Sequence, residues 1–221
     1  IISVKDISNR RPTSGAELVS LSPGIRIQKS QGGGGSPVIR GFEANRLLLV
    51  VDGVRLNNAI YRSGHLQNSL TIHPNMIERV EVVYGSSSVG YGSDALGGVV
   101  HYYTKNPLIN NEKKIRTQLS SDFSTANNSY INSISTELSF KKWASLTSLS
   151  YSDFGDIRMG RNRTHGYENW GLNFLYSLNN RSTYSPDPVI NLNPSIQKNT
   201  DYNQIDLLQK FLFKLNTENQ V

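Results

Sequence analysis

Residues 47–55 read Leu47-Leu48-Leu49-Val50-Val51-Asp52-Gly53-Val54-Arg55, an apolar run followed by a turn dipeptide. All five residues before the Asp are apolar, which is typical of a strand that is covered on both of its faces. The Asp-Gly pair supplies residue types that a tight turn between strands favours. We therefore expect a short, fully buried strand here, followed directly by a chain reversal.

Other short elements flank this strand on both sides. Alternation of apolar and polar residues predicts strands. A short segment that ends at Ser-Pro-Gly, or one that begins with Pro, predicts a short helical turn. The expected strands are residues 1–4, 25–29, 38–41, 80–84 and 99–104, and the expected helical turns are 17–21 and 74–78. The first hundred residues therefore indicate a mixed α+β domain of short strands.

The sequence changes character after Asn106-Pro107, where Ser, Asn and Thr dominate. Longer segments with a two-residue period appear at 130–140, 144–151 and 205–215, each about ten residues long, which suits a tilted strand crossing a bilayer. A short turn near Lys142 contrasts with a loop of about 50 residues before Tyr202. Short turns on one side and long loops on the other are typical of outer-membrane barrels. A soluble β-sandwich has similar strands, so this half alone leaves both folds open.

Composition excludes several classes of protein. No run approaches the roughly 18 to 20 apolar residues of a spanning helix, which argues against a helical membrane protein. The absence of Cys excludes disulfide scaffolds, zinc ribbons and thiol catalysis. The net charge is +6, but the 23 Lys and Arg are spread along the chain, as ordinary solubilising charge is. We therefore expect no nucleic-acid partner.

The motifs do not indicate an enzyme. The string Gly90-Tyr91-Gly92-Ser93-Asp94-Ala95 matches a dinucleotide-binding fingerprint in letters, but the residues after it break helices and lead into a strand. A dinucleotide site needs a helix to begin there, because the helix N-terminus binds the pyrophosphate. Metalloprotease and nucleophile-elbow motifs are also absent from the sequence. We expect no catalytic residues and no intrinsic cofactor.

One histidine lies in a sequence context that would expose it. His65 sits in the polar segment Tyr61-Arg62-Ser63-Gly64-His65-Leu66-Gln67-Asn68, where Gly64 gives the backbone freedom to present a side chain outward. A loop histidine of this kind binds a metal or haem iron in a minority of cases and is otherwise structural. The pattern alone leaves both interpretations of His65 open.

Five segments in order resemble the plug of a TonB-dependent outer-membrane receptor. They are Pro23-Gly24-Ile25, Ile39-Arg40-Gly41-Phe42, Leu48 to Arg55, Ile77 to Val83 and Tyr91 to Val99. The resemblance implies an α+β plug domain over residues 1–107. It also implies that residues 108–221 form the first about four antiparallel strands of a large transmembrane β-barrel of roughly 22 strands. We accordingly expect this chain to be a fragment of a longer protein.

The same resemblance implies roles for particular residues. Loops at the plug apex touch the substrate in this family, and the matching loops here are 31–36, 42–46 and 57–67. The implied ligand-binding residues are Ser36, Arg46, Asn57, Tyr61, Arg62, His65 and Gln67. Arg40 stands where the family has a plug arginine that pairs with barrel acids and so latches the plug. Tyr84 occupies the position where the family usually has a second such arginine.

The segment around His65 resembles the plug loop of haem and haemoglobin receptors, where a histidine can bind haem iron axially. The resemblance thus implies an importer in the outer membrane of a Gram-negative bacterium, in contact with lipid and driven by the TonB complex. We expect the TonB contact segment to lie upstream of Ile1. A ferric siderophore or glycan importer is the alternative within the family. A secreted β-rich adhesion domain is the alternative from another class, although it has no use for the plug motifs in this order.

Overall fold

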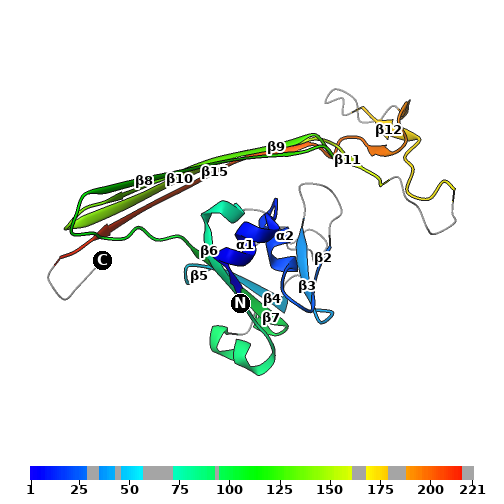
Figure 1. The fold of residues 1–221 in the computed structure, drawn as a ribbon. Coiled ribbons are helices and arrows are strands. Elements are labelled where there is room, and N and C mark those ends of the chain that lie inside the picture. Colours follow the sequence, from blue (N-terminus) through cyan, green and yellow to red (C-terminus); the bar gives the residue numbers. More distant parts are fainter. Residues whose placement is uncertain are drawn as a thin grey trace.

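The computed structural model describes residues 1–28, 35–42, 46–56, 72–92, 95–160, 168–178 and 188–215. Most strands belong to two sheets, one of five strands and one of four. Figure 1 shows the long four-stranded sheet lying over the first domain, with the β11 to β14 region beyond one end of that sheet. We call the first domain the plug and the four-stranded sheet the wall.

The plug is a mixed sheet with helices packed against it. Its elements are β1 (Ile2–Ser3), α1 (Val4–Arg10), α2 (Gly15–Ser20), β2 (Ile25–Gln28), β3 (Ser36–Ile39), β4 (Leu47–Val51), β5 (Val54–Arg55), η3 (Pro74–Met76), β6 (Ile77–Val83), η4 (Gly85–Tyr91) and β7 (Gly98–Thr104). The strand order in the main sheet is β1-β6-β7-β4-β5. Strands β4 and β7 are parallel, and the other neighbours are antiparallel.

The apolar run Leu47–Val51 forms β4, and its two faces contact two different clusters. Leu47 and Leu49 pack with Leu18 of α2 in the larger core. Leu48 and Val50 pack on the opposite face with Ala95 and Val99. The prediction of a strand covered on both faces is confirmed, and the Asp52-Gly53 turn follows it as expected.

Two elements differ from the sequence prediction. The expected opening strand has only two residues and is followed by α1, because Ser3 and Asp6 form a capping box that starts a helix. The expected helix at 74–78 is a single 3-10 turn, Pro74–Met76, and the chain becomes strand β6 at Ile77. The β-branched and apolar residues of β6 pack into the core, and this packing outweighs the helix-start signal of the proline.

The wall consists of four long antiparallel strands in the order β15-β10-β9-β8. They are β8 (Lys114–Ser124), β9 (Ser129–Ser139), β10 (Trp143–Phe154) and β15 (Tyr202–Phe213). The expected about four strands are therefore present. Between β10 and β15, the strands β11 (Ile157–Arg158), β12 (Leu175–Ser177), β13 (Pro188–Ile190) and β14 (Ile196–Gln197) form two small antiparallel pairs.

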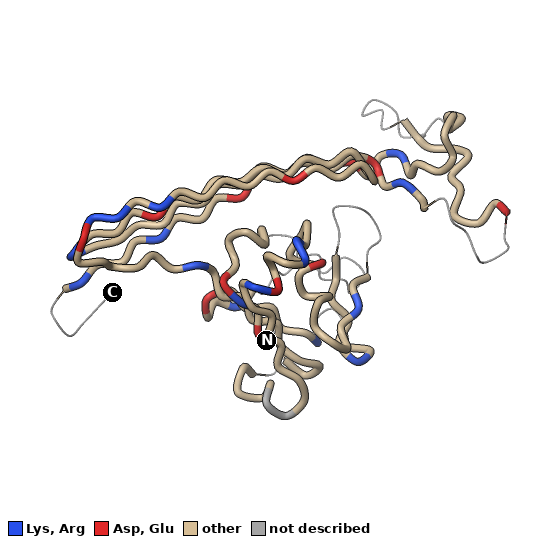
Figure 2. Tube along the Cα trace, in the orientation of Figure 1, with Lys and Arg blue, Asp and Glu red and all other residues tan. Residues whose placement is uncertain are grey.

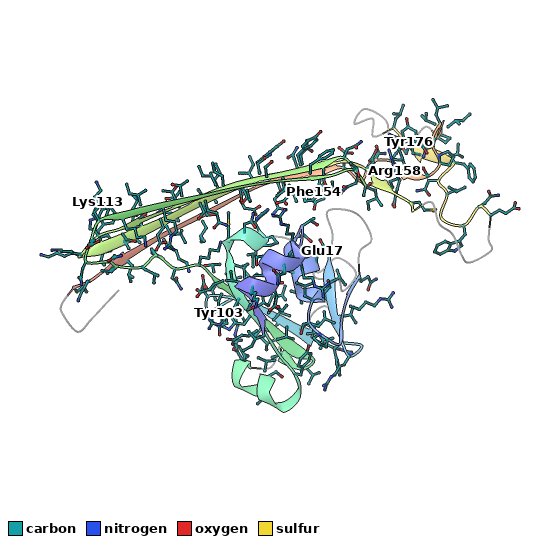
Figure 3. All side chains as sticks on the ribbon, in the orientation of Figure 1. Glu17, Tyr103, Lys113, Phe154, Arg158 and Tyr176 are labelled. Carbon is teal, nitrogen blue, oxygen red and sulfur yellow. The ribbon has the colours of Figure 1, made fainter. Side chains whose placement is uncertain are left out.

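The two faces of the wall differ in polarity, and side chains project from both (Figure 3). In the register of the sheet, Leu119, Ile134, Leu149 and Leu207 lie opposite one another on the outer face, and all four are exposed. The neighbouring residues Ser120, Ser133, Ser150 and Asp206 form the matching row on the inner face. An apolar outer face and a polar inner face are typical of outer-membrane barrel strands.

Charge gathers at one end of the wall. Figure 2 shows Lys and Arg where β8 begins and where β9 turns into β10; these residues are Lys113, Lys114, Arg116, Lys141 and Lys142. Within the described part of the chain, no helix is long and apolar enough to cross a membrane.

Candidate functional site: the seam between plug and wall

The plug contacts the inner face of the wall along a polar seam, and an ion pair holds one end of it. The Lys210 ammonium of β15 lies 2.9 Å from the Asp52 carboxylate in the β4–β5 turn. It also donates to Oδ1 of Asn106 at 2.8 Å. The Thr104 backbone N–H and hydroxyl donate to Asp52 at 2.9 and 2.5 Å. We call these four residues the anchor.

The anchor keeps Asp52 charged. Burial alone would raise the pKa of the Asp52 carboxyl, but hydrogen bonds from Thr104 and Lys210 outweigh burial and hold this pKa below its ordinary value. Because Asp52 binds a proton less readily in the folded state, the anchor stabilises the fold above the ordinary carboxyl pKa. That stabilisation is lost as the pH falls through the lowered value.

A double-mutant cycle in the complete receptor should measure the strength of the anchor. We expect the cycle of Asp52→Asn and Lys210→Met to give a coupling free energy of about 1 kcal/mol, as partly exposed ion pairs do. The measurement is unfolding of the plug in urea, monitored by its sensitivity to a protease. Strictly additive effects of the two substitutions would show that the ion pair contributes nothing.

Neutral hydrogen bonds join plug and wall near the other end of the seam. The Asn75 amide donates to the hydroxyls of Ser120 at 2.9 Å and Ser133 at 2.7 Å, and these hydroxyls lie 2.7 Å from each other. Arg11 of the plug pairs with Asp122 of β8 at 3.2 Å, but both side chains are solvent-exposed. Exposed pairs of this kind add little stability. We call the region around Asn75 and its serine partners the hydroxyl end.

His73 is buried at the hydroxyl end and is held in its neutral form. Its Nδ1 accepts the backbone N–H of Asn75 at 3.2 Å, which caps the 3-10 turn. Its Nε2 is buried and has no hydrogen-bond partner among the described residues. Burial lowers the pKa of His73 from 6.5 to about 4, against a smaller opposing effect of the Asp122 charge.

A cavity of about 580 Å³ lies beside these contacts, between α1 and the inner face of β8. Its lining includes Arg11, His73, Asn75, Lys105, Gln118 and Ser120. Hydroxyl, amide and charged groups therefore dominate the part of the cavity that the wall and the η3 turn form. Such a surface suits a hydrated or hydrogen-bonding solute.

The expected latch residue Arg40 contacts the plug itself. Its guanidinium carbon lies 5.2 Å from the centre of the Tyr84 ring, a cation–π contact. The Tyr84 hydroxyl donates to the Pro23 carbonyl at 2.8 Å. The Tyr84 ring therefore packs against the Arg40 guanidinium within the plug. The pairing of Arg40 with acids of other barrel strands stays a prediction.

The expected ligand-binding residues divide into two groups. Ser36 opens β3, pairs with Gln28 and is only 3% exposed, so its assignment to an exposed apical loop was wrong. Arg46 is exposed just before β4, and its carbonyl accepts the Gly97 N–H at 2.7 Å. The others lie outside the described residues, and their roles stay predictions; they are Asn57, Tyr61, Arg62, His65 and Gln67. Among the described residues, no group of His, Asp and Glu could hold a metal ion.

Sequence reasoning missed the seam residues. The Asp52-Gly53 pair predicts only a turn, and the helical turn predicted at 74–78 assigns no role to its neighbour His73. Lys210 lies among apolar residues in an alternating strand, and that alternation is the one local sign that its side chain faces inward. The pairing of Lys210 with Asp52 depends on how the plug packs against the wall. No local sequence pattern carries that information.

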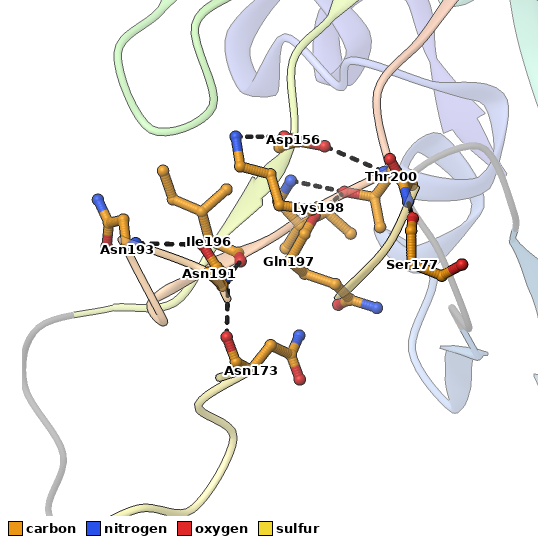
Figure 4. A network of polar contacts seen from close by, with 11 residues as sticks. Asp156, Asn173, Ser177, Asn191, Asn193, Ile196, Gln197, Lys198 and Thr200 are labelled. Carbon is orange, nitrogen blue, oxygen red and sulfur yellow. Dashed lines mark hydrogen bonds and ion pairs between the residues drawn. The ribbon is translucent and has the colours of Figure 1, made fainter. Parts of the chain in front are cut away.

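Polar contacts rather than an apolar core order the segment between β10 and β15 (Figure 4). Asp156 accepts the Thr200 N–H at 3.1 Å and pairs with Lys198 at 3.3 Å. The buried Asn191 amide donates to the carbonyls of Asn173 and Ile196, both at 2.8 Å. These contacts hold the described parts of the segment, residues 155–160, 168–178 and 188–201, together beyond the end of the wall that lies opposite the basic turns.

Comparisons with known proteins agree with this architecture. Residues 1–99 match the family described as TonB-dependent Receptor Plug Domain. The vitamin B12 transporter BtuB of Vibrio vulnificus is 39% identical over 106 residues, which are 47% of this chain and 17% of the transporter. The structure of the FrpB iron transporter from Neisseria meningitidis superposes with a TM-score of 0.73 at 17% identity, covering 98% of this chain and 29% of that one. The structure of the copper transporter OprC superposes with a TM-score of 0.61 at 19% identity, and the match covers 69% of this chain and 23% of OprC.

Residues 1–99 thus match the plug domain of TonB-dependent receptors. The fold of the chain is this plug followed by several antiparallel strands of the receptor barrel, and the location of such receptors is the outer membrane of Gram-negative bacteria. The relatives are transporters and not enzymes, as the sequence indicated. The chain spans between a sixth and a third of the length of these relatives. The names of these three relatives give vitamin B12, iron and copper as the transported substances, and none of the three names haem.

Proposed function

We propose that the complete receptor imports an iron-containing ligand across the outer membrane through TonB-driven movement of the plug. The observation that carries the proposal is a plug domain seated by polar contacts on the inner face of barrel strands. An ion pair and a few neutral hydrogen bonds hold the plug in register, yet they are weak enough for a mechanical pull to break. The ligand binds loops at the apex, and movement of the plug admits it.

Haem, free or from haemoglobin, is the ligand we propose first. The support is the segment Ser63-Gly64-His65-Leu66-Gln67-Asn68, which is similar to the plug loop of haem receptors. An imidazole is a common axial ligand of haem iron, so His65 would bind the metal directly. Arg62 would pair with a haem propionate, because guanidinium binds carboxylates in a bidentate manner.

A ferric siderophore is the second candidate, and two observations favour it. Tyr61 and Arg62 also suit an anionic iron chelate. A ferric enterobactin receptor is among the structural neighbours that cover nearly the whole chain. A glycan importer of the same architecture is a further alternative. The plug match argues against a secreted adhesion domain, because such a domain contains no plug.

Haemin binding by the complete receptor tests the ligand. We expect a saturable shift of the haemin Soret band with the wild type, and its loss with His65→Ala. His73→Asn is the matched control, since His73 is buried in the plug and should leave the shift unchanged. A competing ferric siderophore should not displace haemin. No shift with the wild type would contradict haem as the ligand and favour the siderophore.

Uptake by cells tests the transport proposal itself. Cells that express the complete receptor should accumulate radioiron from haemin or from a ferric siderophore, and deletion of TonB should abolish accumulation while leaving surface binding intact. Accumulation that is independent of TonB would contradict the proposed mechanism.

A further inference from the structure

Cationic side chains from separate parts of the sequence gather at one end of the wall (Figure 2). Three segments meet there, residues 110–114, 140–143 and 213–215. The Asn110 N–H donates to the Phe140 carbonyl at 3.3 Å, and the Lys214 N–H donates to the Lys142 carbonyl at 2.9 Å. The three segments contain five lysines and one acid, Glu112. The topology therefore concentrates charge that is spread along the sequence.

Three of these lysines are exposed beside the outer face of the wall. Lys113 immediately precedes β8, and Lys141 and Lys142 form the turn between β9 and β10. The Lys113 ammonium lies 5.7 Å from the centre of the Phe140 ring, a cation–π contact. None of the three lysines forms an ion pair with another residue that the structure describes. We call these three residues the lysine rim.

Aromatic side chains continue from the lysine rim onto the outer face. Phe140 and Trp143 stack with their ring centres 4.4 Å apart. Phe213 of β15 is the cross-strand partner of Trp143 and is exposed, as is Phe211, the preceding residue on the same face. Positive charge thus borders an apolar, aromatic surface, and this arrangement matches the headgroup and acyl chains of a phospholipid.

The positions of the aromatic residues place the lysine rim at the level of the lipid headgroups. A second aromatic pair, Phe123 and Tyr130, lies near the other end of the outer face, with ring centres 4.7 Å apart. Tyr130 pairs with Asp153, which lies ten residues along β10 from Trp143. Ten residues of a strand tilted by about 40° rise about 26 Å, close to the apolar band of about 25 Å that such barrels present to lipid. The rim therefore lies just outside the hydrocarbon layer.

The lengths of the connections indicate which side of the membrane the lysine rim faces. Strands β9 and β10 are joined at the rim by residues 140–142, whereas β10 and β15 are joined at the opposite end by residues 155–201. In outer-membrane barrels, short turns lie on the periplasmic side and long loops on the extracellular side. The rim therefore faces the periplasmic leaflet, which consists of phospholipids.

We propose that the lysine rim binds the phosphate group of an anionic phospholipid, of the phosphatidylglycerol type, in the periplasmic leaflet, and that the acyl chains of this lipid lie against Phe140 and Trp143. Lysine ammonium groups bind phosphate as point charges. A free phosphate would leave the aromatic pair uncovered, whereas a phospholipid satisfies both parts of the surface. The inference concerns the wall and does not depend on which ligand the receptor imports.

Quenching by spin-labelled lipids tests this site in the complete receptor. Residues 1–221 contain no Cys, so a fluorophore can be attached through Asn111→Cys beside the lysine rim, after replacement of any cysteines in the rest of the receptor. Ala126→Cys, in the uncharged turn between β8 and β9, gives the matched control at the other end of the wall. The receptor is placed in phosphatidylcholine vesicles with a small fraction of spin-labelled phosphatidylglycerol or spin-labelled phosphatidylcholine. The nitroxide is on the acyl chain next to the headgroup, and the ratio of quenching by the two lipids measures the preference.

The lysine rim should attract the anionic lipid locally. We expect at least about a fivefold preference for phosphatidylglycerol at position 111, the effect of one lysine near a charged lipid surface, and no preference at position 126. The triple variant Lys113→Gln, Lys141→Gln and Lys142→Gln should lose the preference, and the variant with arginine at the same three positions should keep it. Equal quenching by the two lipids at position 111, or a preference that survives in the glutamine variant, would overturn the inference. An equal preference at positions 111 and 126 would also overturn it.

Soluble glycerol phosphate distinguishes a lipid from a free phosphate ester. We expect glycerol phosphate, at the concentration of the anionic lipid, to leave the preference at position 111 unchanged, because it has no acyl chains to contact the aromatic pair. Sodium chloride at the same ionic strength is the control for screening of charge. Loss of the preference with glycerol phosphate alone would show that the rim binds free phosphate groups, and it would contradict a lipid as the occupant.

Discussion

Lowering the pH from 7 to 5 should reduce the free energy of unfolding of the plug, and the His73→Asn substitution should remove about 2 kcal/mol of this reduction. The pKa of His73 is about 4 in the fold, and the ordinary value is 6.5. Between these values the unfolded chain binds a proton that the folded plug does not. Stability is therefore complete above pH 6.5 and falls as the pH decreases toward 4.

Asparagine is the matched replacement, because its side-chain oxygen can accept the Asn75 N–H as Nδ1 does and so keeps the cap. The measurement is urea unfolding of the plug in the complete receptor at several pH values. Burial also lowers the pKa of His101, so some pH dependence persists in the variant. Equal slopes for wild type and His73→Asn between pH 7 and 5 would show that the imidazole is hydrated in the closed plug.

Local sequence patterns predicted the parts of the fold that repeat with a fixed period or form continuous apolar runs. Leu47–Val51 forms β4, and the alternation from Tyr130 onward forms β9, because burial of one or both faces selects those patterns. Helix α1 was missed, since its capping box consists of only Ser3 and Asp6 and lies in a segment that begins with apolar, β-branched residues. Local capping outweighed β-propensity at that point.

The candidate site was predictable only in part. Resemblance to a family indicated loops at the apex, and of these Arg46 is exposed whereas Ser36 is buried in a strand. The seam depends on partners that are distant in sequence, such as Asp52 with Lys210 and Asn75 with Ser133. A single sequence contains no signal for such pairs, because each member has an adequate local explanation as a turn residue, a cap or a strand residue.

Substitution of Gly97 by Ala should be among the most damaging single-methyl changes in the plug. A Cβ at this position would lie 2.3 Å from Cβ of Phe42 and 3.0 Å from a methyl group of Leu47. The Phe42 Cβ cannot rotate away, since it is bonded to a backbone that two hydrogen bonds hold to Ile39. The backbone must therefore shift, and we expect a loss of about 3 kcal/mol in the free energy of unfolding.

Gly90→Ala is the control for this prediction, because a Cβ at that position would have no atom within 4 Å and the backbone has no positive φ. Ala at an unconstrained site reduces the freedom of the unfolded chain, so this variant should be neutral or slightly stabilised. Both variants of the complete receptor are compared by urea unfolding of the plug. Similar stabilities of the two variants would show that Phe42 and Leu47 can move to accommodate the added methyl group. The close approach of the Gly97 backbone to the 39–42 turn would then not be needed for stability. A large difference would place the requirement for glycine in packing rather than in backbone conformation, since only the contacts of the added methyl group distinguish the two sites.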